Sequence, residues 1–166
     1  MTLTELNKAD SKGAGLFFRQ CCTSSIWADQ MVTGRPYKDG SHLRDYADYC
    51  WGGLSEVDYL EAFDGHPKIG DIESLKKKFD GSQDMARNEQ SSVAEANIET
   101  LDSLSLGNAE YEKKFGFIFI VFASGKSAEE MLNILEGRID NSRTEEIATA
   151  AEQQRLIFQL RLRNLL

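Results

Sequence analysis

The chain has 166 residues, of which 41% are hydrophobic, so it has the size of one domain and can bury an apolar core. Its formal net charge of −8 argues against a nucleic-acid or anionic-membrane surface, because such surfaces need clustered lysine and arginine. We therefore expect a single acidic domain over residues 1–166 that binds neither nucleic acid nor membrane.

The lack of a recognisable targeting signal and the pattern of cysteines predict a cytoplasmic protein. Residues 1–7 contain no basic segment followed by an apolar core, and no apolar run approaches the roughly 20 residues that a bilayer span needs. The cysteines are Cys21, Cys22 and Cys50, an odd number that includes two neighbours, which is not the pattern of a disulfide framework. We expect buried thiols in a reducing compartment.

In chain order, the pattern predicts mostly helix. Only Pro36 and Pro67 interrupt the chain, so long stretches are free to be helical. Ser127 and Glu130 form a predicted capping box, and glutamates follow Thr144 in the first turn of the last helix. The predicted helices cover about residues 12–32, 41–50, 55–63, 72–79, 83–106, 127–138 and 144–165.

One apolar and aromatic run, residues 115–123, has the pattern of a buried strand. No other segment has comparable strand character with which it could pair. We expect a buried extended segment that lies between helices. The sequence thus predicts an all-α fold, a single compact helical domain of seven to nine helices with one buried extended segment near 115–123.

The first candidate for chemistry is His66, one of two histidines, which lies between Gly65 and Pro67. A residue before proline is pushed towards an extended backbone, so the ring is presented from a fixed loop, as a catalytic imidazole would be. Alternatively, a histidine before proline serves only as a turn residue.

Glu89 is the second candidate. In a helix over residues 83–106, a rotation of 100° per residue places Glu89 on one stripe with Met85, Val93 and Ala96. A carboxylate that faces a core needs a partner, and such groups concentrate at functional sites. The alternative is that Glu89 lies at the edge of the stripe and reaches solvent.

The third candidate is Arg161 in the last helix. It flanks an apolar stripe, Arg155 borders the same stripe, and Arg163 points away from it. Arginine beside a buried face can pair a carboxylate or hold a substrate oxygen, or it can simply extend its head into water. The stripe consists of Ile147, Ala151, Phe158, Leu162 and Leu165.

Two other motifs are weak. Gly125-Lys126-Ser127 resembles the end of a phosphate-binding loop, but Ile120 stands where that loop needs its first glycine, and no Gly-x-Ser-x-Gly nucleophile motif occurs. His42 reads as an exposed residue at a helix start.

Taken together in order, the motifs resemble the decarboxylases of 2-oxo-4-hydroxy-4-carboxy-5-ureidoimidazoline (OHCU), which act in urate degradation. The resemblance spans nearly the whole chain. Its landmarks are Leu6-Asn7, Trp27-Ala28, Arg35-Pro36-Tyr37, the run from His66 to Gly70, Glu89-Gln90, Asn108 to Tyr111, Phe115-Gly116-Phe117, Leu135 to Ile139 with Asn141 and Glu146, and Leu160-Arg161-Leu162.

The resemblance implies an all-helical homodimer that converts OHCU to (S)-allantoin and CO2 with no metal and no organic cofactor. It implies that His66 is the catalytic acid or base and that Glu89 and Arg161 are its catalytic partners. The substrate contacts it implies come from Pro67, Ala86, Arg87, Asn88, Gln90, Phe119, Ile120 and Val121.

One position departs from the family pattern. Members often carry a serine three residues before the glutamate, and this chain has Ala86 there. One hydroxyl contact to substrate is therefore in doubt, and Arg87, Asn88 or a water could replace it.

A non-enzymatic helical interaction module, with the apolar run as a partner groove, is the alternative interpretation of the whole chain.

Overall fold

The computed structural model describes residues 1–66 and 90–165, and within these ranges the predicted all-α fold is confirmed, with eight helices and no strand. None of these helices combines the length and apolar character that a membrane span requires. The helices are α1 (Leu3–Lys8), α2 (Ser11–Cys21), α3 (Ser25–Thr33), α4 (Gly40–Gly52), α5 (Glu56–Asp64), α7 (Gln90–Phe115), α8 (Ala128–Ile139) and α9 (Arg143–Leu165).

The chain divides into two compact units. The first unit comprises Met1–His66 with Ile147–Leu166, and the second comprises Pro67–Glu146. Most of α9 thus belongs to the first unit, and its first turn belongs to the second. That residues 1–166 act as one domain stays a prediction.

The single helix predicted over residues 12–32 is wrong, because two helices, α2 and α3, occupy this stretch. Cys22 is extended at φ −151°, and the Ser24 hydroxyl accepts the Trp27 N–H to begin α3. This N-cap satisfies an otherwise orphan amide, so a new helix can start after the break. The short helix α1 was not predicted, although Thr2 and Glu5 form a capping box at its start.

The long central helix ends later than predicted. It was expected to stop at Leu106, but α7 continues through Gly107 to Phe115. A Cβ at Gly107 would lie 2.8 Å from Leu135 Cδ2 of α8, so the glycine serves close helix packing rather than helix termination. The predicted helix over 72–79 and the predicted start at residue 83 lie outside the described residues.

An aromatic cluster forms the core of the first unit. Trp27 and Phe158 are fully buried, with ring centroids 5.0 Å apart, and the Trp51 ring packs edge-on against Phe158. Each indole N–H finds a carbonyl at 3.1 Å, Trp27 on Ala47 and Trp51 on Ala151. These bonds let two large amphipathic rings be buried without an unpaired donor.

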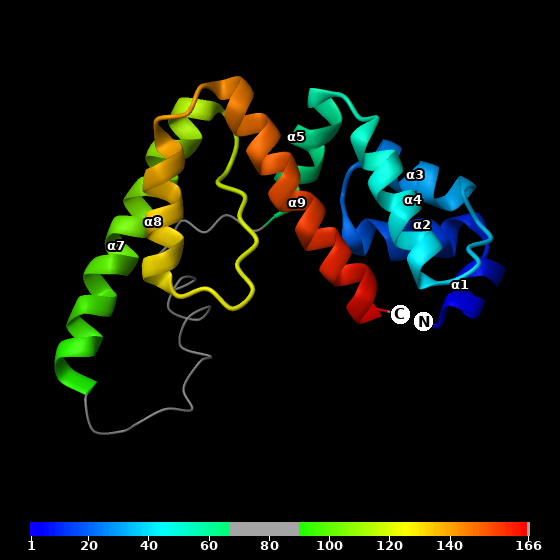
Figure 1. The fold of residues 1–166 in the computed structure, drawn as a ribbon, viewed down its shortest axis with the longest axis horizontal. Helices are drawn as coiled ribbons and strands as arrows, with labels where there is room; N and C mark the ends of the chain where they lie inside the picture. The colour runs from blue at the N-terminus through cyan, green and yellow to red at the C-terminus, as the bar shows by residue number, and fades with distance from the viewer. Residues whose placement is uncertain (67–89, 166) are drawn as a thin grey trace. The chain divides into compact units, whose positions relative to one another are not determined.

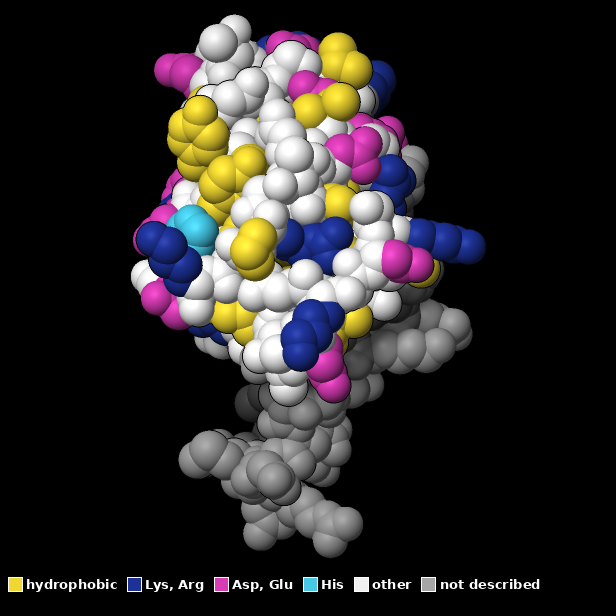
Figure 2. All heavy atoms as spheres, turned by 90° about the vertical axis from the view of Figure 1, so that its right-hand side faces the viewer, with side chains coloured by type: hydrophobic (Ala, Val, Ile, Leu, Met, Phe, Trp, Pro, Cys, Tyr) yellow, Lys and Arg dark blue, Asp and Glu magenta, His cyan; other side chains and the backbone are white. Residues whose placement is uncertain are grey.

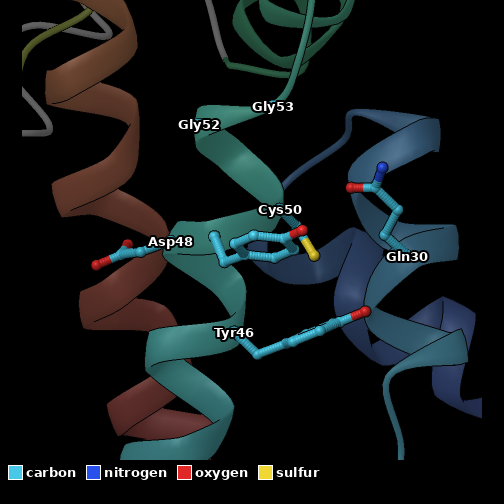
Figure 3. A pocket seen from close by; sticks show the side chains of 7 residues that line it. Gln30, Tyr46, Asp48, Cys50, Gly52 and Gly53 are labelled. Carbon is cyan, nitrogen blue, oxygen red and sulfur yellow. The ribbon is translucent and has the colours of Figure 1, made fainter.

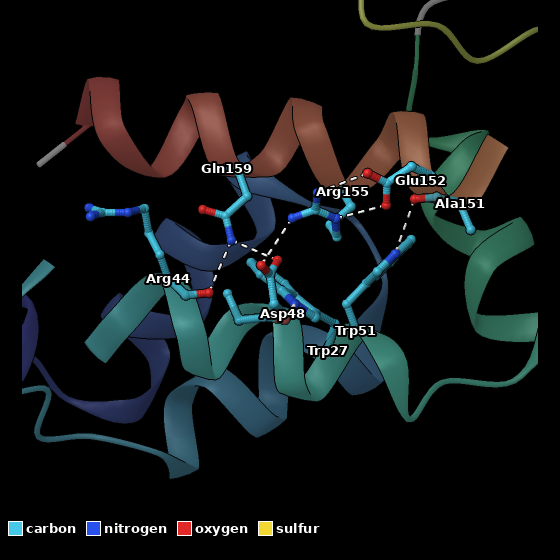
Figure 4. Close-up of polar contacts among 9 residues, drawn as sticks. Trp27, Arg44, Asp48, Trp51, Ala151, Glu152, Arg155 and Gln159 are labelled. Atoms are coloured by element: carbon cyan, nitrogen blue, oxygen red, sulfur yellow. Dashed lines mark hydrogen bonds and ion pairs between the residues drawn. The ribbon is translucent and has the colours of Figure 1, made fainter. Parts of the chain in front are cut away.

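Polar contacts join α4 and α9 along one side of this core, as Figure 4 shows. Arg155 Nη1 lies 3.0 Å from an Asp48 oxygen, and the Gln159 amide donates to the other Asp48 oxygen at 2.7 Å and to the Arg44 carbonyl at 3.0 Å. Arg155 also pairs with Glu152 on its own helix. The contacts fix how α9 lies against α4 within the first unit.

The amino-terminal landmarks of the sequence have structural roles. Asn7 and Tyr37 exchange two hydrogen bonds between side chain and backbone, at 2.8 and 2.9 Å. The Arg35 guanidinium donates to the carbonyls of Leu6 and Ala9 and thereby satisfies the open end of α1. These residues hold the start of the chain against the loop before α4.

In the second unit, α7 and α8 lie side by side (Figure 1). The capping box predicted at the start of α8 is confirmed, since the Ser127 hydroxyl accepts the Glu130 N–H and the Glu130 carboxylate accepts the Ser127 N–H. Between the two helices, residues 116–127 contain no helix. Gly116 allows the chain to leave α7 because its φ is +79°, where glycine is favoured.

The buried extended segment predicted near 115–123 is confirmed, although Phe115 still belongs to α7. Phe117, Phe119, Ile120 and Val121 are all at most 8% exposed. The Tyr111 ring of α7 packs edge-on against Phe117 and Phe119, with ring centroids 5.8 and 5.2 Å apart. The segment is therefore held by edge-on aromatic contacts with α7 and not by pairing with a second strand among the described residues.

On the side of the first unit shown in Figure 2, basic and acidic side chains are interspersed and the apolar side chains form small separate patches. This face carries no continuous basic area, which agrees with the acidic composition of the chain.

Candidate functional site

His66 lies directly after α5, where Gly65 caps the helix and the His66 N–H donates to the Phe63 carbonyl at 3.1 Å. The residue is half-buried. A Cβ at position 65 would lie 2.0 Å from Thr23 Oγ1, and the Thr23 hydroxyl is itself bonded to the carbonyls of Glu61 and Ala62. The turn that presents the imidazole is therefore packed tightly against the end of α2.

The His66 ring contacts Gln154, a residue that the sequence reasoning did not single out. Gln154 is completely buried on α9, and its Oε1 forms a hydrogen bond with His66 Nε2. A signal for it existed in the sequence. Position 154 lies three residues after Ala151 and four before Phe158, so a glutamine occupies the middle of the apolar stripe, where a polar group needs a partner.

Two buried thiols lie at the end of α2. Burial raises the pKa of Cys21 to about 12, and the Arg161 guanidinium acts against this shift. Burial likewise raises the pKa of Cys22 to about 12, against smaller opposing effects from the Ser24 backbone, then the Arg161 guanidinium, then the Gln154 amide. Both thiols remain protonated at neutral pH, so neither is an activated nucleophile, and the prediction of free, buried cysteines is confirmed.

Arg161 is half-buried and donates from Nη1 to the Cys21 carbonyl at 2.9 Å. This is its one hydrogen bond to the described residues, which leaves other guanidinium donors available. Arg155 differs, because the carboxylates of Asp48 and Glu152 occupy its donors. The structure thus distinguishes the two arginines that helical periodicity could not separate, and Arg163 is exposed as expected.

In the second unit, Arg138 holds the backbone of the extended segment at its middle. Arg138 Nη1 donates to the Ile120 carbonyl at 2.8 Å, and its guanidinium lies 4.7 Å from the centre of the Phe119 ring. These two contacts tie the middle of the segment to α8.

Arg138 belongs to a buried polar cluster with Tyr111, Asn141 and Glu146. Glu146 is completely buried and accepts from Arg138 Nε at 2.6 Å, from Arg138 Nη2, from the Tyr111 hydroxyl and from the Asn141 amide at 2.9 Å. Burial, and then the hydrogen bond to Glu146, raise the pKa of Tyr111. The phenol therefore stays a donor, and the carboxylate is fully satisfied.

Several predicted site residues lie outside the described residues. These are Pro67, Ala86, Arg87, Asn88 and Glu89. Gln90 is the first residue of α7, but its side chain is also outside the description.

Two weak motifs have structural roles. Ser127 of the Gly125-Lys126-Ser127 stretch caps α8, and Lys126 lies over the Phe122 ring at 5.5 Å. His42 is in the first turn of α4, where its Nδ1 accepts the Lys38 N–H at 3.1 Å. His42 is partly rather than fully exposed, because its ring packs against Tyr37.

A separate surface pocket of about 580 Å³ lies on the first unit, between α3 and α4 (Figure 3). Neither His66 nor Arg161 is among the described residues that line it. Within residues 1–66 and 90–165, no cluster of three His, Cys, Asp or Glu side chains is arranged to hold a metal ion. The pocket is lined by Gln30, Tyr46, Asp48, Tyr49, Cys50, Gly52 and Gly53.

Comparison with known proteins gives a consistent result. The family model for OHCU decarboxylase matches residues 7–163. The uric acid degradation bifunctional protein TTL of Arabidopsis thaliana is 34% identical over 148 residues, which are 89% of this chain and 46% of that protein. The chain therefore spans about half the length of this relative.

Two further matches cover nearly the full length of the other protein. The 2-oxo-4-hydroxy-4-carboxy-5-ureidoimidazoline decarboxylase of Haloferax volcanii is 25% identical, over 98% of this chain and 94% of that protein. A crystal structure of an OHCU decarboxylase in the presence of (S)-allantoin matches with a TM-score of 0.73 and 32% identity, over 95% of this chain and 98% of the other.

Proposed function

Because the chain belongs to the OHCU decarboxylase family, we propose that the protein removes CO2 from OHCU and forms (S)-allantoin, as a carboxy-lyase of urate degradation. The observation that carries the proposal is the family match over residues 7–163, which runs through His66, Glu89 and Arg161. The half-buried imidazole mounted on a rigid turn supports it.

The chemistry of the substrate explains how side chains alone could carry the reaction. Loss of the carboxylate leaves an electron pair on the ring carbon, and the adjacent carbon–nitrogen double bond can take up this charge. The substrate is then its own electron sink, so we propose that the reaction needs no organic cofactor or metal. The protein has to orient the substrate, stabilise charge and transfer one proton to one face of the carbon.

In this proposal His66 is the acid or base, because imidazole changes its protonation near neutral pH. Glu89 holds the ureido or ring amides, and Arg161 binds the ring carbonyl with the donors that Cys21 leaves available. Pro67, the turn of Ala86, Arg87, Asn88 and Gln90, and the backbone of Phe119, Ile120 and Val121 provide substrate contacts.

The proposal extends to assembly and location. We infer a homodimer and a cytoplasmic location, the latter supported by three free thiols and an acidic composition. Light scattering coupled to size-exclusion chromatography tests the first, and a monomeric mass at micromolar concentration refutes it. Fractionation of cells that express the protein tests the second.

The activity is tested by following the decay of freshly generated OHCU in the ultraviolet together with the circular dichroism of the allantoin formed. The enzyme must accelerate the decay and yield one enantiomer. A racemic product formed at the spontaneous rate refutes the function and favours an interaction module.

The role of His66 is tested by His66→Ala and His66→Gln, which should each lower turnover by on the order of 100-fold or more. His42→Gln is the matched control, because it replaces the other histidine at a helix start in the same unit. Turnover close to wild type in either His66 variant removes His66 from the mechanism.

A further inference from the structure

We propose that Thr23 is a positioning residue, which holds the last turn of α5 and thereby sets the place of the His66 imidazole relative to the Arg161 guanidinium. Thr23 lies in the junction between α2 and α3, residues 21–25, and all three residues belong to the first unit. The inference deepens the proposed function and rests on it for the catalytic roles of His66 and Arg161.

One end of the junction holds Arg161. Cys21 is the last residue of α2, and Arg161 Nη1 donates to its carbonyl at 2.9 Å. The last carbonyls of a helix have no partner within the helix, so they need a donor from elsewhere. Cys22 follows with an extended backbone and is completely buried, so the chain is closely packed directly after this carbonyl.

The middle of the junction holds the end of α5. The Thr23 hydroxyl lies 3.2 Å from the Glu61 carbonyl and 3.2 Å from the Ala62 carbonyl, between which it shares its one proton. Both carbonyls are among the last four of α5, which again lack partners within the helix. Thr23 therefore caps α5 from a distant part of the chain, and the next turn closes with the bond from the His66 N–H to the Phe63 carbonyl.

Gly65 shows how closely Thr23 meets the turn before His66. A Cβ at position 65 would lie 2.0 Å from Thr23 Oγ1 and 2.4 Å from Thr23 Cγ2. The hydroxyl and the methyl group of Thr23 thus both fill the space that a side chain would take. The residue directly before the imidazole is packed on Thr23, so a shift of this side chain displaces the turn.

A second contact joins α5 to the same junction in the opposite direction. The Glu61 carboxylate accepts from the Ser25 N–H at 2.9 Å and from the Ser25 hydroxyl at 2.5 Å. Ser25 is the first residue of α3, where unpaired amides and the helix dipole favour a negative charge. Thr23 therefore binds the backbone of α5, while a side chain of α5 binds the backbone of α3.

The two proposed catalytic groups are thus held only two residues apart on one junction. Cys21 binds Arg161, and Thr23 holds the turn that carries His66. Proton transfer requires the reacting groups in a defined geometry, and a displacement of 1 Å can lower the rate about 100-fold. Loss of the Thr23 hydroxyl should therefore affect turnover through the position of the imidazole.

Amide hydrogen exchange followed by NMR tests whether Thr23 holds the turn, independently of activity. Thr23→Val keeps the shape of the side chain and removes the donor, so the His66 amide should exchange about 5-fold faster, the effect of one lost hydrogen bond. Thr33→Val is the matched control, because the Thr33 hydroxyl also donates to a helix carbonyl of this unit, that of Asp29 at 2.9 Å. Unchanged exchange at His66 in Thr23→Val overturns the inference.

Kinetics test the positioning role. Thr23→Val should lower kcat about 10-fold or more with a smaller change in KM, because substrate binds beside a displaced imidazole. Thr23→Ser retains the hydroxyl and should stay within about 3-fold of the wild-type kcat, as should Thr33→Val. Thr23→Ala is the second variant should Thr23→Val fail to fold. A serine variant as slow as the valine variant rules out the hydroxyl as the cause and overturns the inference.

The two measurements separate this inference from the proposed function. If wild-type protein does not accelerate OHCU decay, the proposed function fails, while the exchange result still decides whether Thr23 holds the turn. If the wild type is active and Thr23→Val exchanges faster at His66 but keeps the wild-type kcat, Thr23 is only structural and the inference fails alone.

Discussion

Replacing Glu146 by glutamine tests whether the buried cluster of the second unit stabilises the fold and the extended segment. The carboxylate is completely buried and faces Arg138, whose side chain is 9% exposed. The substitution keeps the shape of the residue and removes the counter-charge. It also turns one oxygen into an amide that can no longer accept from every present donor.

The magnitude follows from burial. Removal of one partner from a buried ion pair costs about 3–5 kcal/mol, because the other charge stays buried without compensation. Glu146→Gln retains one acceptor for Arg138 or Tyr111, so we expect the lower end, about 3 kcal/mol. Arg155→Met provides the comparison, since Arg155 also pairs with two carboxylates, Asp48 and Glu152, but with 30–52% exposure of the three side chains. Its loss should cost about 1 kcal/mol or less.

Urea unfolding followed by helical circular dichroism measures both changes in the free energy of unfolding, with parallel slopes as the condition for comparing midpoints. Because Arg138 holds the Ile120 carbonyl, Glu146→Gln should also raise KM for OHCU more than Arg155→Met does. A loss for Glu146→Gln no larger than that for Arg155→Met would refute the reasoning from burial.

Two further predictions concern the surroundings of His66. Gly65→Ala should destabilise the protein by about 1–3 kcal/mol and lower turnover, because the added Cβ would lie 2.0 Å from Thr23 Oγ1. Gly52→Ala is the control, because a Cβ at position 52 would have no neighbouring atom within 4 Å. Equal thermal stability of the two variants would contradict the packing argument. The raised thiol pKa values predict that the thiols of Cys21 and Cys22 contribute a stability that is fully present below about pH 9 and is lost towards pH 12, because they ionise first in the unfolded chain. Urea midpoints across this range should fall less in a Cys21→Ala, Cys22→Ala double variant, and equal slopes would argue against the thiols as the cause.

Local chemistry explains why most helices could be predicted. Capping residues, first-turn glutamates and apolar periodicity are short-range signals, and they located α4, α5, α8 and α9 to within a few residues. The errors arose where tertiary contacts decide the structure. The sequence predicted that the helix ends just before Gly107, but α7 continues through this glycine, whose missing side chain leaves room for Leu135 of α8.

For the extended segment too, the local sequence pattern predicted part of the structure and tertiary contacts decided the rest. Its apolar and aromatic pattern predicted burial, and the lack of a second such run predicted that it pairs with no strand. The pattern could not predict that Arg138 binds the Ile120 carbonyl, because the arginine reads as the basic last turn of α8. A basic residue in the last turn of a helix usually only interacts with the helix dipole in solvent. The burial of Arg138 in the folded protein shows that it also binds the backbone of the segment.

The contact between His66 and Gln154 marks the limit of periodicity as a guide to a site. A stripe on α9 shows that residue 154 faces a core, and a glutamine there must find a partner. The partner is 88 residues away, on a turn whose direction depends on Gly65 fitting beside Thr23. A polar residue on a helix's apolar stripe thus indicates that it has a buried partner, whereas the fold alone decides which residue that partner is. In this chain the partner of Gln154 is the imidazole of His66.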